Sequence, residues 1–274
     1  MPTSIPTHTT RTVELAGGLS VTIEENGVNT DGQAVLVLHG GAGPRTMSGL
    51  SAALSEHVYT VTPTHPGFDG TPRPEWADTV ADLAVAYLDL LDTLGLSGVM
   101  VIGNSVGGWI ASEMALRDNH GRLGALVLLN AVGIEGDSPE QSVDVRQMAP
   151  ADISKLSFYN PALRPDFSSF SDEQRAGMAA NQKTLATYAG TVFTHDPKLR
   201  RRLHRVTVPV LVVWGEHDGI VTADYGRAFA ESFPFGRFVP VPEAGHFPHI
   251  EQPELTLGAI GDFATNVVNK AASA

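Results

Sequence analysis

Six short apolar runs, interspersed with stretches of helical spacing, constrain the fold of this chain more than any other feature. The runs are continuous rather than alternating, as expected for strands that are buried on both faces. Helices on both sides of a mostly parallel sheet are the common way to cover both faces. The runs lie at residues 34–40, 58–64, 98–104, 125–131, 208–216 and 237–243, and the best helix candidates lie at 74–94, 106–116, 223–231 and 253–268.

The ends of this pattern complete the predicted architecture. Residues 12–27 alternate around a Gly-Gly pair, which predicts an antiparallel hairpin at the sheet edge. The sum is an α/β fold with a mostly parallel sheet of about eight strands and helices on both faces. No strand-like run occurs between residues 134 and 205, and an excursion of this length is typical of a lid or binding element. We therefore predict a core of residues 1–133 and 206–274 with a helical lid inserted at 134–205.

One serine stands where a strand is predicted to end and a helix to begin. The run at 98–104 leads into GNSVGG, and a helical pattern follows at once. This is the context of a G-x-S-x-G nucleophile elbow, in which a strained turn exposes the serine and crowding admits only glycine at Gly103 and Gly107. The N-terminus of the following helix also favours developing negative charge. The pattern predicts Ser105 as a nucleophile.

A serine nucleophile needs a base that takes its proton and a third group that orients the base. Ligands of parallel sheets sit at the carboxyl ends of the strands, so the loops after the last runs are the places to search. His246 lies in PEAGHFPHIEQP, between the last predicted strand and the last helix. His249 is the rival, and we favour His246 because the adjacent Gly245 allows a tighter loop.

The acid is predicted in VVWGEHDGIV, just past a strand. Glu216 abuts the strand and is expected to be held in its turn, which favours Asp218. Taken alone, Asp218 would be interpreted as a capping residue, because Asp is common at caps and turns. Together with Ser105 and His246 it gives the chain order nucleophile, acid, base that α/β-hydrolases show.

A site for the oxyanion is predicted in LHGGAGP at residues 38–44. Its glycines leave the backbone bare enough for an N–H to turn toward Ser105, and the N–H of Val106 supplies a second donor. A well-placed donor of this kind contributes roughly 3 to 4 kcal/mol to a transition state. His39 is expected to fix this loop rather than to perform chemistry.

Five motifs in this order resemble the α/β-hydrolase fold superfamily, in the branch of lid-bearing hydrolases that includes carboxylesterases and meta-cleavage-product C–C hydrolases. They are HGGAG, HPGFDGT at 65–71, GNSVGG, GEHD and AGHFPHIEQP, and the resemblance runs from about residue 12 to 270 apart from the lid. The resemblance implies Ser105 as nucleophile, Asp218 as acid, His246 as base, and Gly41 or Ala42 with Val106 as oxyanion donors.

We therefore predict a serine hydrolase that acts through an acyl-enzyme intermediate on small or medium apolar carboxylic esters. The alternatives are a meta-cleavage-product C–C hydrolase, a cofactor-free haloperoxidase-like enzyme, a hydroxynitrile lyase and a small-molecule receptor of the same fold. Asn104 is similar to the C–C hydrolases, whereas Phe247 stands where these often carry Trp. A serine at the elbow excludes dehalogenases and epoxide hydrolases, which use aspartate there.

The composition excludes several classes of binding partner. A net charge of -12 argues against nucleic acid, and the basic run at 198–205 is interpreted as a solvated helix face. The chain has no cysteine, no secretory h-region and no apolar stretch of membrane-spanning length, so we expect a soluble, cytoplasmic protein without a membrane partner. The sequence has neither a metal-ligand spacing nor a phosphate-binding glycine loop, so we expect no metal and no cofactor. The natural substrate and the oligomeric state, a homodimer included, stay open.

The predicted lid carries many large apolar side chains, which form either an apolar pocket wall or the lid's own core. Its arginines, Arg146, Arg164 and Arg175, are expected mainly at the surface. The apolar residues are Met148, Phe158, Tyr159, Phe167, Phe170, Met178, Tyr188 and Phe193.

Overall fold

A computed structural model describes residues 7–29 and 33–272. Within them a single sheet has eight strands in the order β1-β2-β4-β3-β5-β6-β7-β8. The pairs β1–β2 and β2–β4 are antiparallel and all other neighbours are parallel, which confirms the predicted edge hairpin and the mostly parallel sheet. The strands are β1 (Thr7–Glu14), β2 (Ser20–Gly27), β3 (Ala34–Leu38), β4 (Tyr59–Pro63), β5 (Val99–Asn104), β6 (Leu123–Leu129), β7 (Val210–Gly215) and β8 (Gly236–Val241).

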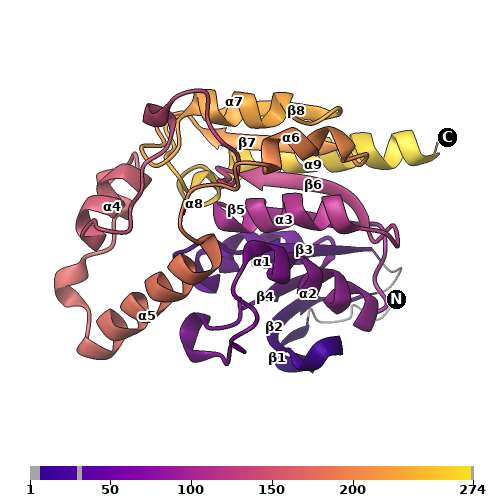
Figure 1. Ribbon diagram of the computed structural model, residues 1–274. Helices are drawn as coiled ribbons and strands as arrows, with labels where there is room; N and C mark the ends of the chain where they lie inside the picture. The colour runs from indigo at the N-terminus through magenta and orange to yellow at the C-terminus, as the bar shows by residue number, and fades with distance from the viewer. Residues whose placement is uncertain (1–6, 30–32, 273–274) are drawn as a thin grey trace.

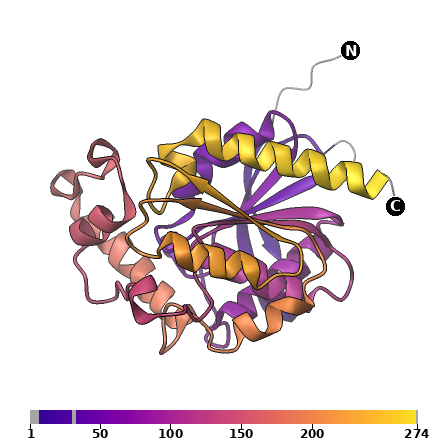
Figure 2. The same ribbon diagram turned by 90° about the horizontal axis from the view of Figure 1, so that it is seen from above.

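Helices cover both faces of this sheet (Figures 1 and 2). Side chains of α1 (Ser48–Ser55) and α9 (Pro253–Ala272) pack in one apolar cluster, on one face. Those of α2 (Val80–Thr93), α3 (Val106–Arg117) and α7 (Ala223–Glu231) pack in a second cluster, on the other face. Alternate residues of the central strands belong to different clusters, which is why their sequences read as continuous apolar runs.

Helix α2 begins later than the predicted 74–94 because a capping box fixes its start. The Asp82 N–H donates to Thr79 Oγ1 at 3.2 Å, and the Asp82 carboxylate accepts from the Thr79 N–H at 3.0 Å. The predicted helices at 106–116, 223–231 and 253–268 are confirmed within four residues at their ends. Helix α1 was not among the predicted helices, since eight residues containing Gly49 and three serines give little helical signal.

The segment between β6 and β7 carries no strand and holds α4 (Pro150–Ser157), α5 (Asp172–Ala189) and α6 (Leu199–Arg202). Helices α4 and α5 stand together to one side of the sheet and its helical layers, on the left of Figure 1. Gly133 and Thr194 lie side by side, because the Gly133 N–H donates to the Thr194 carbonyl at 3.0 Å. The division into core and lid at 134 and 205 stays a prediction.

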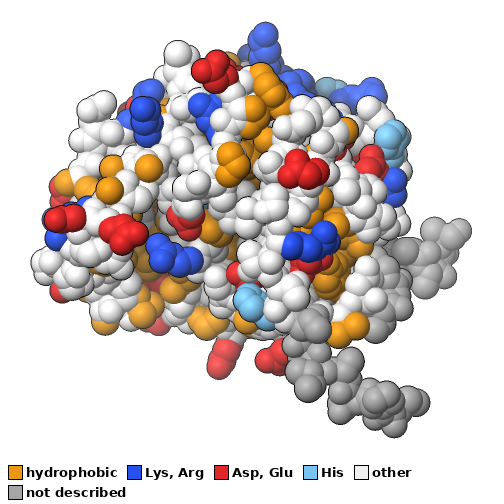
Figure 3. Space-filling model, turned by 90° about the horizontal axis from the view of Figure 1, so that it is seen from below, with side chains coloured by type: hydrophobic (Ala, Val, Ile, Leu, Met, Phe, Trp, Pro, Cys, Tyr) orange, Lys and Arg blue, Asp and Glu red, His pale blue; other side chains and the backbone are white. Residues whose placement is uncertain are grey.

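Ion pairs within the fold engage part of the basic run at 198–205. Arg202 pairs with the buried Glu113 of α3 at 3.0 Å and also with Asp196, and Arg200 pairs with Asp137 at 2.6 Å. On the face drawn in Figure 3, acidic and basic side chains are interspersed among hydrophobic and neutral ones. Among the helices of residues 7–29 and 33–272, none is long and apolar enough to cross a bilayer.

Candidate active site

The elbow at Ser105 is built by backbone crowding. Ser105 has φ 54° and ψ −120°, a conformation that non-glycine residues rarely adopt. A Cβ at Gly103 would lie 2.3 Å from the backbone of Gly107, and a Cβ at Gly107 would lie 2.3 Å from the carbonyl oxygen of Leu38. The predicted need for glycine at both positions is confirmed, and the close approach of β3, β5 and α3 explains how the strained turn persists.

Two of the predicted residues form a buried hydrogen-bonded pair. His246 Nδ1 lies 2.7 Å from Asp218 Oδ2, and the two residues are only 5% and 6% exposed. Asp218 Oδ1 also accepts from the backbone N–H groups of Ile220 at 2.7 Å and Val221 at 3.2 Å. These bonds hold the Asp218 carboxyl group in place, and its bond to Nδ1 orients the His246 ring.

Asn130 completes this arrangement and was missed in the sequence. Its Nδ2 donates to Asp218 Oδ2 at 2.7 Å, and its Oδ1 accepts from the Gly215 N–H at 3.1 Å. The predicted run at 125–131 placed it inside a strand, whereas β6 ends at Leu129 and Asn130 is fully buried with φ 43°. A polar residue at the end of an apolar run, of a type that tolerates positive φ, was the available signal.

Ser105 is joined to the His246 loop through its neighbour. Asn104 Nδ2 donates to the carbonyl oxygens of His246 at 3.1 Å and Leu129 at 3.0 Å. A Cβ at Gly40 would lie 3.0 Å from Ser105 Cβ, so the HGGAG loop passes directly beside the serine. The structure thus places the elbow, the His246 loop and the glycine loop at one edge of the sheet.

Two stacked histidines hold the glycine loop. His39 Nδ1 donates to the Gly40 carbonyl at 2.7 Å, and His39 Nε2 accepts from the His65 N–H at 3.0 Å. His65 Nε2 donates to the His39 carbonyl at 2.8 Å, and its Nδ1 accepts from the Tyr87 hydroxyl. Burial lowers the pKa of His39 to about 4 and that of His65 well below its usual range, so both rings are neutral anchors. This agrees with the structural role expected for His39.

Of the predicted oxyanion donors, Gly41 and Ala42 lie in this loop and Val106 follows Ser105. Among the described residues, the backbone N–H groups of Gly41 and Ala42 donate to no protein acceptor. Val106 is the first residue of α3, where N–H groups lack intrahelical partners. No described backbone acceptor engages any of these three N–H groups, and their role as oxyanion donors stays a prediction.

His249 and Glu216, the residues weighed against His246 and Asp218, make structural contacts instead. His249 is buried, and its Nε2 donates to the Thr46 carbonyl at 3.1 Å, which ties α8 (Pro248–Glu251) to the segment after the glycine loop. Burial lowers the pKa of His249 to about 4, with a smaller effect from His246. Glu216 is exposed, and its N–H donates to the Val241 carbonyl at 3.0 Å, as expected for a residue held in the turn.

The end of α4 is built into both loops that carry the acid and the base. The Leu156 carbonyl accepts from the Gly219 N–H at 2.9 Å, and the Ser157 carbonyl accepts from the His246 N–H at 2.7 Å. The Glu251 carboxylate accepts from three backbone N–H groups, those of Gly245 at 2.6 Å, Asn160 at 2.8 Å and Tyr159 at 3.3 Å. The bonds of Glu251 to Asn160 and Tyr159 join residues 91 and 92 positions apart in the chain, so no local sequence signal predicts them.

The large apolar side chains of the predicted lid serve mostly as anchors. Tyr188 and Phe193 are buried in the core cluster that contains α2 and α3. Phe158 packs against Phe247 with ring centroids 5.1 Å apart, and Tyr159 stacks on His217 at 4.3 Å. The three lid arginines bond within their own segment, to the Phe158 carbonyl (Arg164), the Phe167 carbonyl (Arg175) and Asp144 (Arg146).

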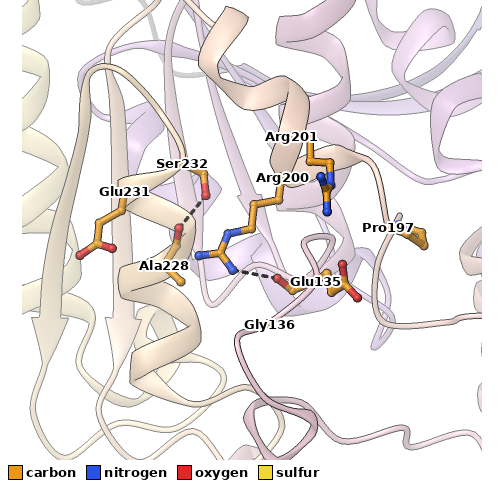
Figure 4. Close-up of a pocket in the computed structure, with 8 residues that line it drawn as sticks. All are labelled: Glu135, Gly136, Pro197, Arg200, Arg201, Ala228, Glu231 and Ser232. Atoms are coloured by element: carbon orange, nitrogen blue, oxygen red, sulfur yellow. Dashed lines mark hydrogen bonds between the residues drawn. The ribbon is translucent and has the colours of Figure 1, made fainter.

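Two surface hollows lie away from Ser105. One of about 550 Å³ lies between α6 and α7, where Arg200 donates to the Glu135 carbonyl at 3.3 Å (Figure 4). The other, of about 420 Å³, borders the His246 loop and is lined by Tyr159, Asn160, Pro161, Glu243, Glu251 and Gln252. Neither hollow is lined by Ser105, Asp218 or His246. The described residues hold no cluster of three His, Cys, Asp or Glu suited to a metal ion.

The chain thus combines a mostly parallel eight-stranded sheet, a strained Ser105 at the end of β5, and a buried Asp–His pair whose loop bonds to the neighbouring Asn104. Residues 35–259 match the model of the alpha/beta hydrolase family, and the chain belongs to this family.

Similar proteins include a lipase, a hydrolase of an oxo-dienedioate and an esterase. Lipase 3 of Moraxella sp. is 24% identical over 88% of this chain and 80% of its own. The 2-hydroxy-6-oxononadienedioate/2-hydroxy-6-oxononatrienedioate hydrolase of Paraburkholderia phymatum is 24% identical over 91% of this chain and 93% of its own. The solved structure of a thermophilic esterase from Thermogutta terrifontis covers 95% of this chain and 99% of its own at 24% identity, with a TM-score of 0.71.

The elbow predicts that Gly107→Ala destabilises the protein, although alanine is the better helix former. The new methyl group would meet the Leu38 carbonyl, and overpacking of this kind costs about 1 to 3 kcal/mol or more in the free energy of unfolding. Gly177→Ala in α5 is the matched control, because no atom lies within 4 Å of its Cβ position, and it is expected to stabilise by up to about 1 kcal/mol. Urea unfolding of both variants measures the difference, and equal effects would contradict the crowding.

The buried, neutral His249 predicts a loss of stability in mild acid. Its pKa is lowered to about 4 in the folded state, so below pH 6.5 the unfolded chain binds a proton that the folded protein does not. Stability from this group is therefore complete above pH 6.5 and falls toward pH 4, by about 2 kcal/mol between pH 7.5 and 5. His249→Gln should make the fall shallower by about that amount in urea unfolding, whereas His57→Gln, at an exposed position, should leave it unchanged.

Proposed function

We propose that this protein is a serine hydrolase that cleaves small or medium apolar carboxylic esters through an acyl-enzyme intermediate. The observation that carries the proposal is the buried Asp218–His246 hydrogen bond at 2.7 Å beside a serine held at φ 54°. A strained serine at a helix N-terminus, with a histidine already oriented by a carboxylate, has the arrangement of an activated nucleophile.

The proposed reaction proceeds in two halves. His246 Nε2 takes the proton of Ser105 Oγ as the oxygen attacks the ester carbonyl carbon. The N–H groups of Val106 and of Gly41 or Ala42 stabilise the oxyanion, and His246 then gives the proton to the departing alcohol. In the second half, water attacks the acyl carbon as His246 Nε2 takes its proton. His246 then returns this proton to Ser105 Oγ as the carboxylic acid leaves. Asp218 stabilises the imidazolium and keeps its orientation throughout.

Ester cleavage is favoured over C–C cleavage by what surrounds the serine. A C–C hydrolase must first move a proton within its dienol substrate, which requires polar groups near the serine besides the triad. Phe247 follows His246 and packs against Phe158, and the lid arginines bond to their own segment. The C–C hydrolase stays the second candidate, supported by Asn104 before the serine and by relatives with that name.

A fluorophosphonate probe is expected to label Ser105 alone, as peptide mapping would show, because this serine is held in a strained turn whose neighbour Asn104 bonds to the loop of the oriented His246. Ser105→Ala should abolish both labelling and ester turnover. His246→Ala should also abolish turnover, since the proposed reaction uses this ring, which Asp218 orients, to accept the serine proton.

His249→Ala is the matched control, because His249 bonds to the Thr46 carbonyl. Assayed at pH 7.5 on folded protein, it should retain most of the activity. Labelling at another serine, or loss of turnover in His249→Ala with turnover kept in His246→Ala, would overturn the assignment.

Esters of small or medium acyl groups should turn over at least about tenfold better in kcat/KM than a vinylogous diketone. This corresponds to about 1.4 kcal/mol in transition-state stabilisation. An ester requires only the triad and the oxyanion donors, whereas the diketone also requires polar groups near the serine. Steady-state rates on both substrate types decide between the candidates. Efficient diketone cleavage with negligible ester hydrolysis would establish the second one.

A further inference from the structure

Helix α5 is fastened across the loop that follows β4. Asn181 Nδ2 donates to Asp69 Oδ1 at 2.7 Å, and Asn181 Oδ1 accepts from the Asp69 N–H at 2.8 Å. Thr184 Oγ1 donates to the Gly67 carbonyl at 3.0 Å, and the Tyr188 hydroxyl donates to a carbonyl in the same loop, that of Pro66, at 2.9 Å. Spacings of three and four residues place these side chains on one helix face, so this face of α5 is fixed against the core.

Leu185 lies on the same face, between Thr184 and Tyr188 in the chain. A Cβ built at Gly41 would lie only 2.5 Å from Leu185 Cδ2, with Cγ and Cδ1 at 3.5 and 3.6 Å. The isobutyl group of Leu185 therefore rests directly on the glycine loop. The neighbouring Gly40 also approaches Ser105 closely, since a Cβ there would lie 3.0 Å from Ser105 Cβ.

We propose that Leu185 is a specificity-determining residue that limits the size of the ester group lying over the glycine loop. The proposal rests on the proposed ester hydrolysis at Ser105. An ester bound there turns its carbonyl oxygen toward Val106 and toward Gly41 or Ala42, so one of its two substituents must extend past the glycine loop. Leu185 occupies the space above that loop, and a longer substituent meets its methyl groups.

The anchoring of α5 makes this space depend on the side chain rather than on the helix. The polar bonds of Asn181, Thr184 and Tyr188 do not involve Leu185, so they remain when its side chain is shortened. Leu185→Ala should therefore enlarge the space instead of letting the helix sink into it. Leu185→Phe should reduce the space.

The test measures kcat/KM for two series of esters, p-nitrophenyl esters with acyl chains from acetate to octanoate and acetates of alcohols from methanol to octanol. In the series that lengthens the substituent lying over the glycine loop, Leu185→Ala should raise the ratio of kcat/KM for the longest ester to kcat/KM for the shortest by about tenfold. This is the scale of a change of one or two methylenes in an apolar pocket. Leu185→Phe should lower the same ratio. A ratio is the readout because a general loss of folded protein scales both rates equally.

Leu163→Ala, which shortens an exposed leucine of the same segment, is the matched control and should leave both ratios unchanged. Unchanged ratios in both Leu185 variants, with esters still hydrolysed by the wild-type protein, would overturn the role of Leu185 alone. Failure of the wild-type protein to hydrolyse any ester would overturn the proposed function, and the role of Leu185 with it. The two failures are therefore distinguishable.

Discussion

The contact between β3, β5 and the start of α3 is the constraint on which the site depends. Three backbone segments meet with no room for a Cβ at Gly103 or Gly107, and the chain can turn there only through the strained conformation of Ser105. The strain is supported by bonds to β6 and beyond, because the Ser105 N–H donates to the Leu129 carbonyl at 3.0 Å and the Ser105 carbonyl accepts from the Val132 N–H at 3.2 Å. The position of the serine is thus a property of the central sheet and not of a flexible loop.

The loops that carry Asp218 and His246 depend instead on the segment between β6 and β7. A buried backbone N–H group needs an acceptor, and the Leu156 and Ser157 carbonyls supply acceptors to Gly219 and His246. The end of α4 therefore holds both loops in place through backbone hydrogen bonds. At α5 the segment is attached differently, by side chains that bond to the loop after β4. The segment between β6 and β7 is therefore joined to the core at two places, by backbone bonds at the end of α4 and by side-chain bonds at α5.

The sequence was sufficient to predict what periodicity and strand ends encode. The apolar runs located the six strands from β3 to β8 to within two residues, and polar residues just past strand ends led to Ser105, Asp218 and His246. Asn130 was not identified from the sequence because it lies within the apolar run that predicted a strand. The Asp69–Asn181 pair and the bonds of Glu251 to Tyr159 and Asn160 were not predicted because they join residues 91 to 112 positions apart. Periodicity shows which face of an element is buried but not which distant segment lies against it.

Environment, rather than residue type, distinguishes the four buried histidines around the site. His39, His65 and His249 use ring nitrogens to bond backbone groups, and burial lowers the pKa of each, so that all three stay neutral near pH 7. His246 alone bonds a carboxylate, and that carboxylate is itself held by Asn130 and two backbone N–H groups. The three neutral rings anchor backbone segments, whereas the His246 ring is oriented by the Asp218 side chain, and this orientation is what the proposed role of His246 as the base requires.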